Sequence, residues 1–137
     1  MVNKNHIFII LILIFFDQIT KFYFKNKKFL IFNYTENTGA AFSLLEGYTL
    51  LLILISLIVI IATVFYYFKL KKSPKYLRLG LLFVFSGTIG NLIDRVSLGY
   101  VRDFIDLRVW PIFNFADIYN VTGFLIILYY YYKQNKK

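Results

Sequence analysis

The side chains that could perform chemistry in this 137-residue chain form a restricted set. The sequence contains no cysteine, and its single histidine is His6. A cysteine nucleophile and a thiolate metal site are therefore excluded, and a Ser-His-Asp triad is not expected. Any catalytic chemistry must use Asp, Glu, Lys, Arg, Ser, Thr, Tyr or Asn.

Four of the seven acidic residues lie between residues 90 and 117, where they accompany three arginines. One-to-one pairing would leave one carboxylate without a partner, although a salt-bridged loop is an equally open interpretation. A helical turn would place Asp103 and Asp106 on one side, whereas an extended segment would not. The seven charged residues are Asp94, Arg95, Arg102, Asp103, Asp106, Arg108 and Asp117.

A second group of ionisable residues lies near the end of the first apolar stretch. Asp17 and Lys21 are four residues apart with the acid first, which is the favourable order for an ion pair on a helix face. We therefore predict an internal ion pair that orders this end of the helix. A lysine that is paired and charged is a poor general base.

The composition indicates a membrane protein. The chain is 59% hydrophobic and 21% aromatic, and only 17% of its residues are charged, against about a quarter in ordinary soluble domains. A domain of this size could not bury that much apolar surface in water. Disorder is excluded by the high hydrophobicity, and a disulfide scaffold by the lack of cysteine.

Four apolar stretches are long enough, or nearly so, to cross a bilayer core, which needs about 20 helical residues. We predict an all-α membrane protein with four transmembrane helices, forming a single membrane domain over residues 1–137. Polar residues at 17–21 take the place of a cleavage site, so the first stretch is expected to be a retained anchor. The predicted spans are about 5–24, 48–68, 77–94 and 115–132.

The distribution of charge predicts the topology. Nine of the 16 Lys and Arg residues lie in the N-terminal tail, the 69–78 loop and the C-terminal tail, which contain no Asp or Glu. The positive-inside rule then places both termini and this loop in the cytoplasm. The net charge of +9 is interpreted as membrane orientation and contact with anionic lipid, not nucleic-acid binding, because the basic residues flank apolar stretches.

Several polar residues fall at a similar depth in this topology. At about 1.5 Å of rise per residue, Asp17, Asn91, Asp94 and Asp117 lie in the outer third of the membrane. Ionisable residues within spans are costly and usually mark a functional site, although snorkelling to the nearby surface is the alternative. Three separate spans thus bring polar groups to one layer.

The segments between the spans carry further local patterns. FLIFNYT, within loop 25–47, is typical of a strand, and ENTG predicts a turn in which Asn37 or Gly39 adopts a positive φ. The small residues of GAAFS would let another backbone or a ligand approach closely. Pro111 ends regular structure, and Asn114 can then cap the last helix.

Small residues also mark the third span. Gly80, Gly87 and Gly90 would let a helix approach this span closely. That helix could belong to a bound peptide, but packing among the chain's own helices is the favoured interpretation.

Five of these patterns together resemble the lipoprotein signal peptidase family, also called signal peptidase II. They occur in the family's order and at matching places among the four spans, so the resemblance covers nearly the whole chain. The matching motifs are DQITK (17–21), NTGAAFS (37–43), GNLIDR (90–95), VRDFID (101–106) and FNFAD (113–117).

The resemblance implies an aspartic protease with both termini in the cytoplasm and its active site toward the extracytoplasmic side. By motif, its two catalytic carboxylates fall on Asp103 and Asp117. Support or substrate contact is implied for the other matching positions, which are Asp17, Lys21, Asn37, Gly39, Asn91, Asp94, Arg95, Asn114 and Ala116.

The resemblance also implies partners and a location. The family's substrate is a prolipoprotein whose lipobox cysteine carries diacylglycerol, and cleavage falls on the amino side of that cysteine. We expect a monomer in the bacterial cytoplasmic (inner) membrane, surrounded by membrane lipids. Two departures are Ile118, where Ser is frequent, and Arg102, which could lower the pKa of Asp103 or point to lipid headgroups.

Two carboxylates that share a site cannot both ionise easily, so they hold one proton between them. The ionised member can take a proton from a water that attacks the peptide carbonyl, and the protonated member can assist the leaving amine. No metal or cofactor is required, and acid and base are not assigned individually.

Two other classes of protein remain as alternatives. A proton-coupled transporter would place carboxylates near the midplane, on a path open to both sides. Here the span 48–68 has no charge, and the acids cluster on one side. A non-catalytic assembly or lipid-binding protein would leave the paired acids without a role.

Overall fold

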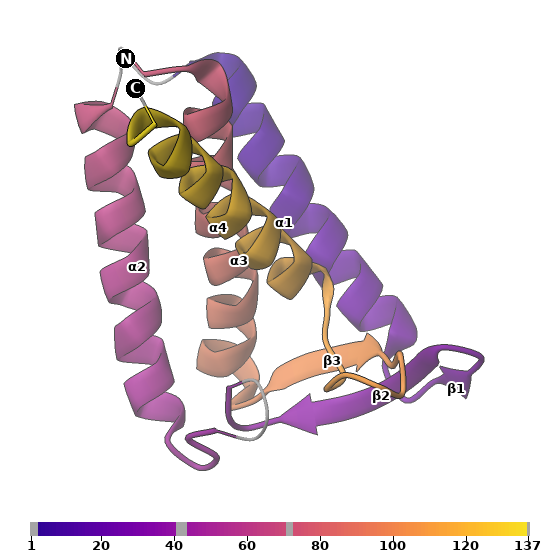
Figure 1. The fold of residues 1–137 in the computed structure, drawn as a ribbon. Helices are drawn as coiled ribbons and strands as arrows, with labels where there is room; N and C mark the ends of the chain where they lie inside the picture. Colours follow the sequence, from indigo (N-terminus) through magenta and orange to yellow (C-terminus); the bar gives the residue numbers. More distant parts are fainter. Residues whose placement is uncertain (1–2, 41–43, 71–72, 137) are drawn as a thin grey trace.

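The chain folds into four helices and a small three-stranded sheet (Figure 1). The computed structural model describes residues 3–40, 44–70 and 73–136. Helices lie over all four predicted spans, within four residues of the expected bounds. In chain order they are α1 (Lys4–Phe24), α2 (Thr49–Lys69), α3 (Lys75–Leu98) and α4 (Phe115–Gln134).

Three of these helices, α1, α2 and α3, are long and apolar enough to cross a membrane by length and composition. The α4 helix is of similar length but is more polar, because Asp117 and Asn120 lie near its start and four consecutive tyrosines, Tyr129 to Tyr132, lie near its end. Of the four predicted spans, α4 is therefore the one least supported by its hydropathy.

The sheet lies at one end of the helices, opposite the start of α1 and the end of α4 (Figure 1). Its strands are β1 (Lys28–Phe29), β2 (Phe32–Asn37) and β3 (Val101–Ile105), all antiparallel in that order. The strand predicted from FLIFNYT is confirmed over Phe32–Thr35, whereas Leu30 and Ile31 form the turn of a β1–β2 hairpin. Because β3 is extended, the helical turn considered for Asp103 and Asp106 does not form.

Stacked aromatic rings join α1 to the sheet. The ring of Phe24, the last residue of α1, stacks on Phe32 of β2 and Phe104 of β3, with centroid distances of 4.1 and 4.8 Å. Phe104 is fully buried. This stack fixes the strand that carries Asp103 against the end of the first helix.

The α3 helix is the centre of the structure, and glycines let α4 pack directly against it. A Cβ atom at Gly80 would lie 3.0 Å from the carbonyl oxygen of Gly123, and one at Gly87 would overlap the carbonyl of Ala116. The side chain of Asp17 takes the corresponding space at Gly90. The glycines of the third span thus allow close packing among the chain's own helices, which confirms the favoured interpretation over the binding of a peptide helix.

The turn predicted at ENTG differs from the structure. Neither Asn37 nor Gly39 has a positive φ, and the nearest described residues that do are Leu30 before them and Leu45 after them. Gly39 is needed for space instead, because a Cβ there would lie 2.7 Å from the carbonyl oxygen of Leu44. Residues 41–43 of the NTGAAFS motif lie outside the described residues.

Candidate active site

Two carboxyl groups, on β3 and on the first turn of α4, face one cavity beside the sheet. The cavity has a volume of about 230 Å³ and is bounded by both Asp103 and Asp117. Arg95 of α3 and the segment from Trp110 to Phe113 form other parts of its wall. The structure therefore brings together the two aspartates that the resemblance singled out.

Asp103 is held by two neutral amide groups. Its Oδ1 accepts a hydrogen bond of 2.6 Å from Asn114 Nδ2, and its Oδ2 accepts one of 2.9 Å from Asn37 Nδ2. The side chain is almost completely buried. Burial and the nearby Asp117 carboxylate raise the pKa of Asp103 to about 7, outweighing the two amide donors.

Asp117 is fixed at the start of α4 by a capping box. The Asn114 side chain accepts a hydrogen bond from the backbone N–H of Asp117, and Asp117 Oδ2 accepts one from the backbone N–H of Asn114. This reciprocal pair satisfies two backbone donors at the helix start. The predicted cap is confirmed, and Asp117 Oδ1 also accepts a 2.7 Å hydrogen bond from Asn91 Nδ2.

Two asparagines connect the carboxylates to the buried lysine. Asn91 Oδ1 accepts hydrogen bonds from Asn114 Nδ2 at 3.1 Å and from Lys21 Nζ at 2.9 Å. Because its oxygen is directed to these donors, the NH₂ group of Asn91 is directed toward Asp117. Lys21 is thus connected to Asp103 and Asp117 by hydrogen bonds through the amides of Asn91 and Asn114, and it forms no direct ion pair with either carboxylate.

The other buried acids are paired with cations. Lys21 Nζ lies 2.9 Å from Asp17 Oδ2 and 3.6 Å from Asp94 Oδ2, and all three side chains are fully buried. Arg102 Nη2 lies 2.7 Å from Asp94 Oδ1. The predicted Asp17–Lys21 pair is confirmed. The Arg102 side chain bonds to Asp94 and Gln18, so it is directed neither at Asp103 nor away from the protein.

The remaining supporting residues hold backbone segments near the pair. The backbone N–H of Ala116 donates to Asp17 Oδ1 at 2.9 Å, which ties the start of α4 to α1. Arg95 Nη2 donates to the carbonyl oxygen of Gly39 at 2.9 Å, which fixes the loop after β2. Ile118 is partly exposed, at 37%.

Asp106 lies outside this network. It accepts hydrogen bonds from Asn33 Nδ2 at 3.0 Å and from the backbone N–H of Arg108 at 2.8 Å. The Asn33 bond is the main cause that lowers the pKa of Asp106 below its usual range. The chain thus offers a neighbouring aspartate that is not part of the buried pair.

Two residues of this network were not singled out from the sequence. Gln18 donates to Asp17 and to the carbonyl oxygen of Gly90 and accepts from Arg102, while Asn120 lines the cavity and accepts from Thr88. Two sequence features could have identified them. Gln18 is the amide residue inside the DQITK motif, and Asn120 follows Asp117 by three residues, which places both on the same helix face. Among the described residues, no group of three His, Cys, Asp or Glu side chains could hold a metal ion.

Comparison with known proteins gives a consistent result. The family model for signal peptidase (SPase) II matches residues 9–133. A lipoprotein signal peptidase of Caldanaerobacter subterraneus subsp. tengcongensis is 40% identical, with 90% of this chain and 92% of the relative covered. One of Clostridium novyi (strain NT) is 38% identical, with 80% and 78% covered.

Solved structures show the same similarity. A bacterial membrane enzyme determined by the in meso method at 2.3 Å resolution has a TM-score of 0.84 and 32% sequence identity, with 97% of this chain and 92% of that chain covered. A second bacterial membrane enzyme, at 1.9 Å, has a TM-score of 0.76 and 30% identity, with 90% of each chain covered.

Proposed function

Because this chain belongs to the signal peptidase II family, we propose that Asp103 and Asp117 are the two catalytic carboxylates of an aspartic endopeptidase. The chain is a bacterial integral membrane protease that removes signal peptides from prolipoproteins, cutting on the amino side of the lipid-modified cysteine. The proposal concerns which residues carry out that reaction and how the chain lies in the membrane.

One observation carries the assignment of the pair. Of the four acids in this network, Asp17 and Asp94 are neutralised by Lys21 and Arg102, whereas Asp103 and Asp117 receive hydrogen bonds from asparagine side chains and a backbone amide. Neutral donors orient a carboxylate without supplying a full positive charge. The pair can therefore retain one proton near neutral pH, as acid–base catalysis by two carboxylates requires.

The proposed reaction uses that single proton. The ionised carboxylate takes a proton from a water molecule, whose oxygen attacks the carbonyl carbon of the scissile peptide bond. The protonated carboxyl donates a hydrogen bond to the carbonyl oxygen, and a proton then passes to the leaving amine as the C–N bond breaks. The asparagines hold the two carboxyl groups in position through both steps.

We infer that α4 is the fourth membrane crossing, despite its lower hydropathy. It packs antiparallel along α3, since Gly87 meets Ala116 and Gly80 meets Gly123 at matching intervals of seven residues. A helix that follows α3 over this length crosses the same layer. We further propose that the chain is a monomer surrounded by lipid, with both termini in the cytoplasm and the sheet on the extracytoplasmic side.

Reporter fusions test this topology. Fusions in the 69–78 loop and after Lys136 should report the cytoplasm, while fusions at Lys28 and Leu98 should report the outside, because nine of the 16 Lys and Arg residues lie at the first end. A cytoplasmic result at Leu98 would place the sheet and Asp103 on the wrong face for the proposed mechanism.

Cleavage of a defined precursor tests the function at this site. The purified chain should cut a diacylglyceryl-modified prolipoprotein and leave the unmodified precursor intact, and a metal chelator should not reduce the rate. Proton flux measured in liposomes serves as the control for the transporter alternative. Flux without cleavage would overturn the assignment, and strong inhibition by the chelator would show that a metal takes part.

The pH dependence of cleavage should report the pair. Activity should fall as pH rises through about 7, since the shared proton is then lost from Asp103 and its partner. In Asn37→Ala, Asp103 loses a donor that favours its ionised form, so its pKa should rise and the alkaline limb should move to higher pH. Rates measured across a pH series check this shift.

The chain offers a matched control on the same strand. Asn33→Ala removes an equivalent amide donor, but from Asp106, which lies outside the pair. Its pH profile should match that of the unaltered enzyme. An equal shift in both variants would mean that the limb does not report Asp103.

A further inference from the structure

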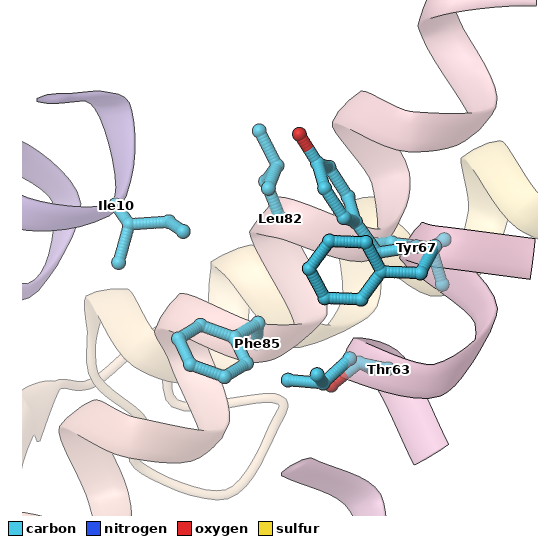
Figure 2. Close-up of a pocket in the computed structure, with 8 residues that line it drawn as sticks. Ile10, Thr63, Tyr67, Leu82 and Phe85 are labelled. Carbon is cyan, nitrogen blue, oxygen red and sulfur yellow. The ribbon is translucent and has the colours of Figure 1, made fainter. Parts of the chain in front are cut away.

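A groove far from the carboxylate pair lies between α1, α2 and α3, near the end of the helices opposite the sheet. Figure 2 shows Ile10, Thr63, Tyr67, Leu82 and Phe85 around a shared space. The space has a volume of about 190 Å³, and Val64, Phe68 and Leu81 complete its lining. Val64 and Phe68 are exposed, so the groove opens on the side of the helices.

Polar groups lie together at one end of this apolar groove. The His6 ring Nδ1 and the Tyr67 hydroxyl are 2.8 Å apart, and this hydrogen bond joins the start of α1 to the end of α2. Arg78 lies on α3 one turn before Leu81 and Leu82 of the groove wall. His6 precedes Ile10 by four residues, and Arg78 precedes Leu82 by four, so each polar residue lies one turn beyond an apolar wall residue.

Arg78 has no negative partner in the part of the chain that the structure describes. Its Nε atom is buried and makes no hydrogen bond, and none of the three ion pairs of the described residues includes it. Acidic side chains are also absent from the neighbouring described segments, because residues 3–16, 49–70, 73–93 and 118–136 contain no Asp or Glu. The Arg78 side chain as a whole is partly exposed, so its charge can be reached by an anion from outside the protein.

Further positive charge lies at the same end of the helices. Lys69 ends α2 and Lys75 begins α3, and the start of α3 has no side-chain cap, so its free N–H groups also present partial positive charge. A groove that is apolar along its length and cationic at one end matches a molecule with an acyl chain and an anionic head.

We propose that this groove binds one phospholipid with an anionic headgroup, its acyl chain lying along the groove and its phosphate beside Arg78. The phosphate would accept hydrogen bonds from the terminal NH₂ groups of the guanidinium and would supply the counter-ion that Arg78 lacks among the described residues. The site is independent of Asp103 and Asp117, so the proposed catalytic assignment and this one can fail separately.

Charge argues against the signal peptide of a substrate as the occupant. Signal peptides carry a positively charged segment before their apolar region. That segment would meet Arg78, Lys69 and Lys75 at the polar end of the groove. An anionic lipid is attracted by the same three residues.

Single cysteines make the proposal testable, because the natural chain contains none. A fluorophore on Val64→Cys, at the groove edge, is compared with one on Leu125→Cys, which is exposed on α4 and is not a groove residue. In nanodiscs of neutral lipid, brominated phosphatidylglycerol should quench the Val64→Cys label more than brominated phosphatidylcholine does. The Leu125→Cys label should show no such preference.

Charge variants then locate the headgroup. In the Val64→Cys background, Arg78→Gln should lower the preference for phosphatidylglycerol by about fivefold, whereas Lys133→Gln removes an equal charge at the exposed end of α4 and should keep it. Arg78→Lys should restore part of the preference. If Arg78→Gln does not accumulate, the comparison of Val64→Cys with Leu125→Cys still decides.

Three results would overturn the proposal. The first is equal quenching by the two brominated lipids at Val64→Cys. The second is an equal loss of the preference for phosphatidylglycerol in Arg78→Gln and Lys133→Gln, which would show that the preference depends on the overall surface charge and not on Arg78. The third is displacement of phosphatidylglycerol by a synthetic signal peptide or by inorganic phosphate, which would assign the groove or the polar end to another ligand.

Discussion

Asp103→Asn and Asp117→Asn are each expected to lower the rate of precursor cleavage by about 10²- to 10⁴-fold, the range supplied by general acid–base groups. Each variant removes one ionisable group from a pair that must share one proton. The double variant should be scarcely slower than either single one, because residues that act as a unit are not additive. Single-turnover cleavage of a lipid-modified precursor measures the rates.

The structure also predicts a structural cost for these variants. Both oxygens of Asp103 accept hydrogen bonds from N–H donors, so an asparagine there must point its own NH₂ group at one of them. Leaving one buried donor unsatisfied costs about 1–3 kcal/mol. Thermal unfolding in detergent must therefore accompany the rates, so that inactivity of folded protein is separated from loss of folded protein.

Asp106→Asn is the matched control for the pair. Asp106 lies three residues from Asp103 but bonds to Asn33 and to the backbone of Arg108. It should retain measurable cleavage. Near-normal turnover by Asp117→Asn, together with an inactive Asp106→Asn, would show that the catalytic pair had been placed on the wrong carboxylates.

Lys21→Met is expected to lower the free energy of unfolding by about 3–5 kcal/mol, the cost of breaking a buried ion pair. Asp17 would lose the Nζ atom that lies 2.9 Å from its Oδ2, and the carbonyl oxygen of Gly90 and Oδ1 of Asn91 would each lose a donor. Asp94 would be less affected, because Arg102 remains beside it. Denaturant or thermal unfolding in detergent measures the loss.

A double variant separates charge from packing. In Lys21→Met with Asp17→Asn, the unpaired buried charge is gone, so stability should recover above that of Lys21→Met alone. The control is Lys25→Met, at an exposed lysine one turn further along, which should change stability by about 0.5 kcal/mol or less. No recovery in the double variant would mean that Lys21 acts through packing and not through charge.

Features that depend on neighbouring residues could be predicted from the sequence. Runs of apolar residues located all four helices, and the four-residue spacing of Asp17 and Lys21 predicted their ion pair. The cap at Asn114 followed from its place after Pro111 and before an apolar run. In each case the partners lie within one or two turns, so spacing alone determines the geometry.

Features that depend on residues far apart in the chain could not be predicted in this way. The hydrogen bond from Asn37 to Asp103 joins residues separated by 66 positions, and the one from Arg102 to Gln18 joins residues separated by 84. Alternation of residue types identifies a strand but not its neighbour. The aspartate pair was therefore reached through the resemblance to a family, because charge counts alone left one unspecified carboxylate.

The turn after β2 was mispredicted for a related reason. Turn-forming residue types suggested a left-handed conformation at Asn37 or Gly39, but Asn37 is extended and bonds to Asp103, and Gly39 is small because the Leu44 backbone lies against it. The same residue types satisfy both requirements. Only the position of the rest of the chain distinguishes a glycine needed for its dihedral angles from one needed for space.

The position of Asn114 has a consequence for biosynthesis. This residue caps α4 and also donates to Asp103, while the first turn of the same helix is tied to α1 by the hydrogen bond from Ala116 to Asp17. A nascent chain that has inserted its first three helices therefore carries one member of the proposed pair, without its partner and with only one of its two amide donors, Asn37. On this arrangement, the protease stays inert on the ribosome and acquires activity when its last helix enters the membrane.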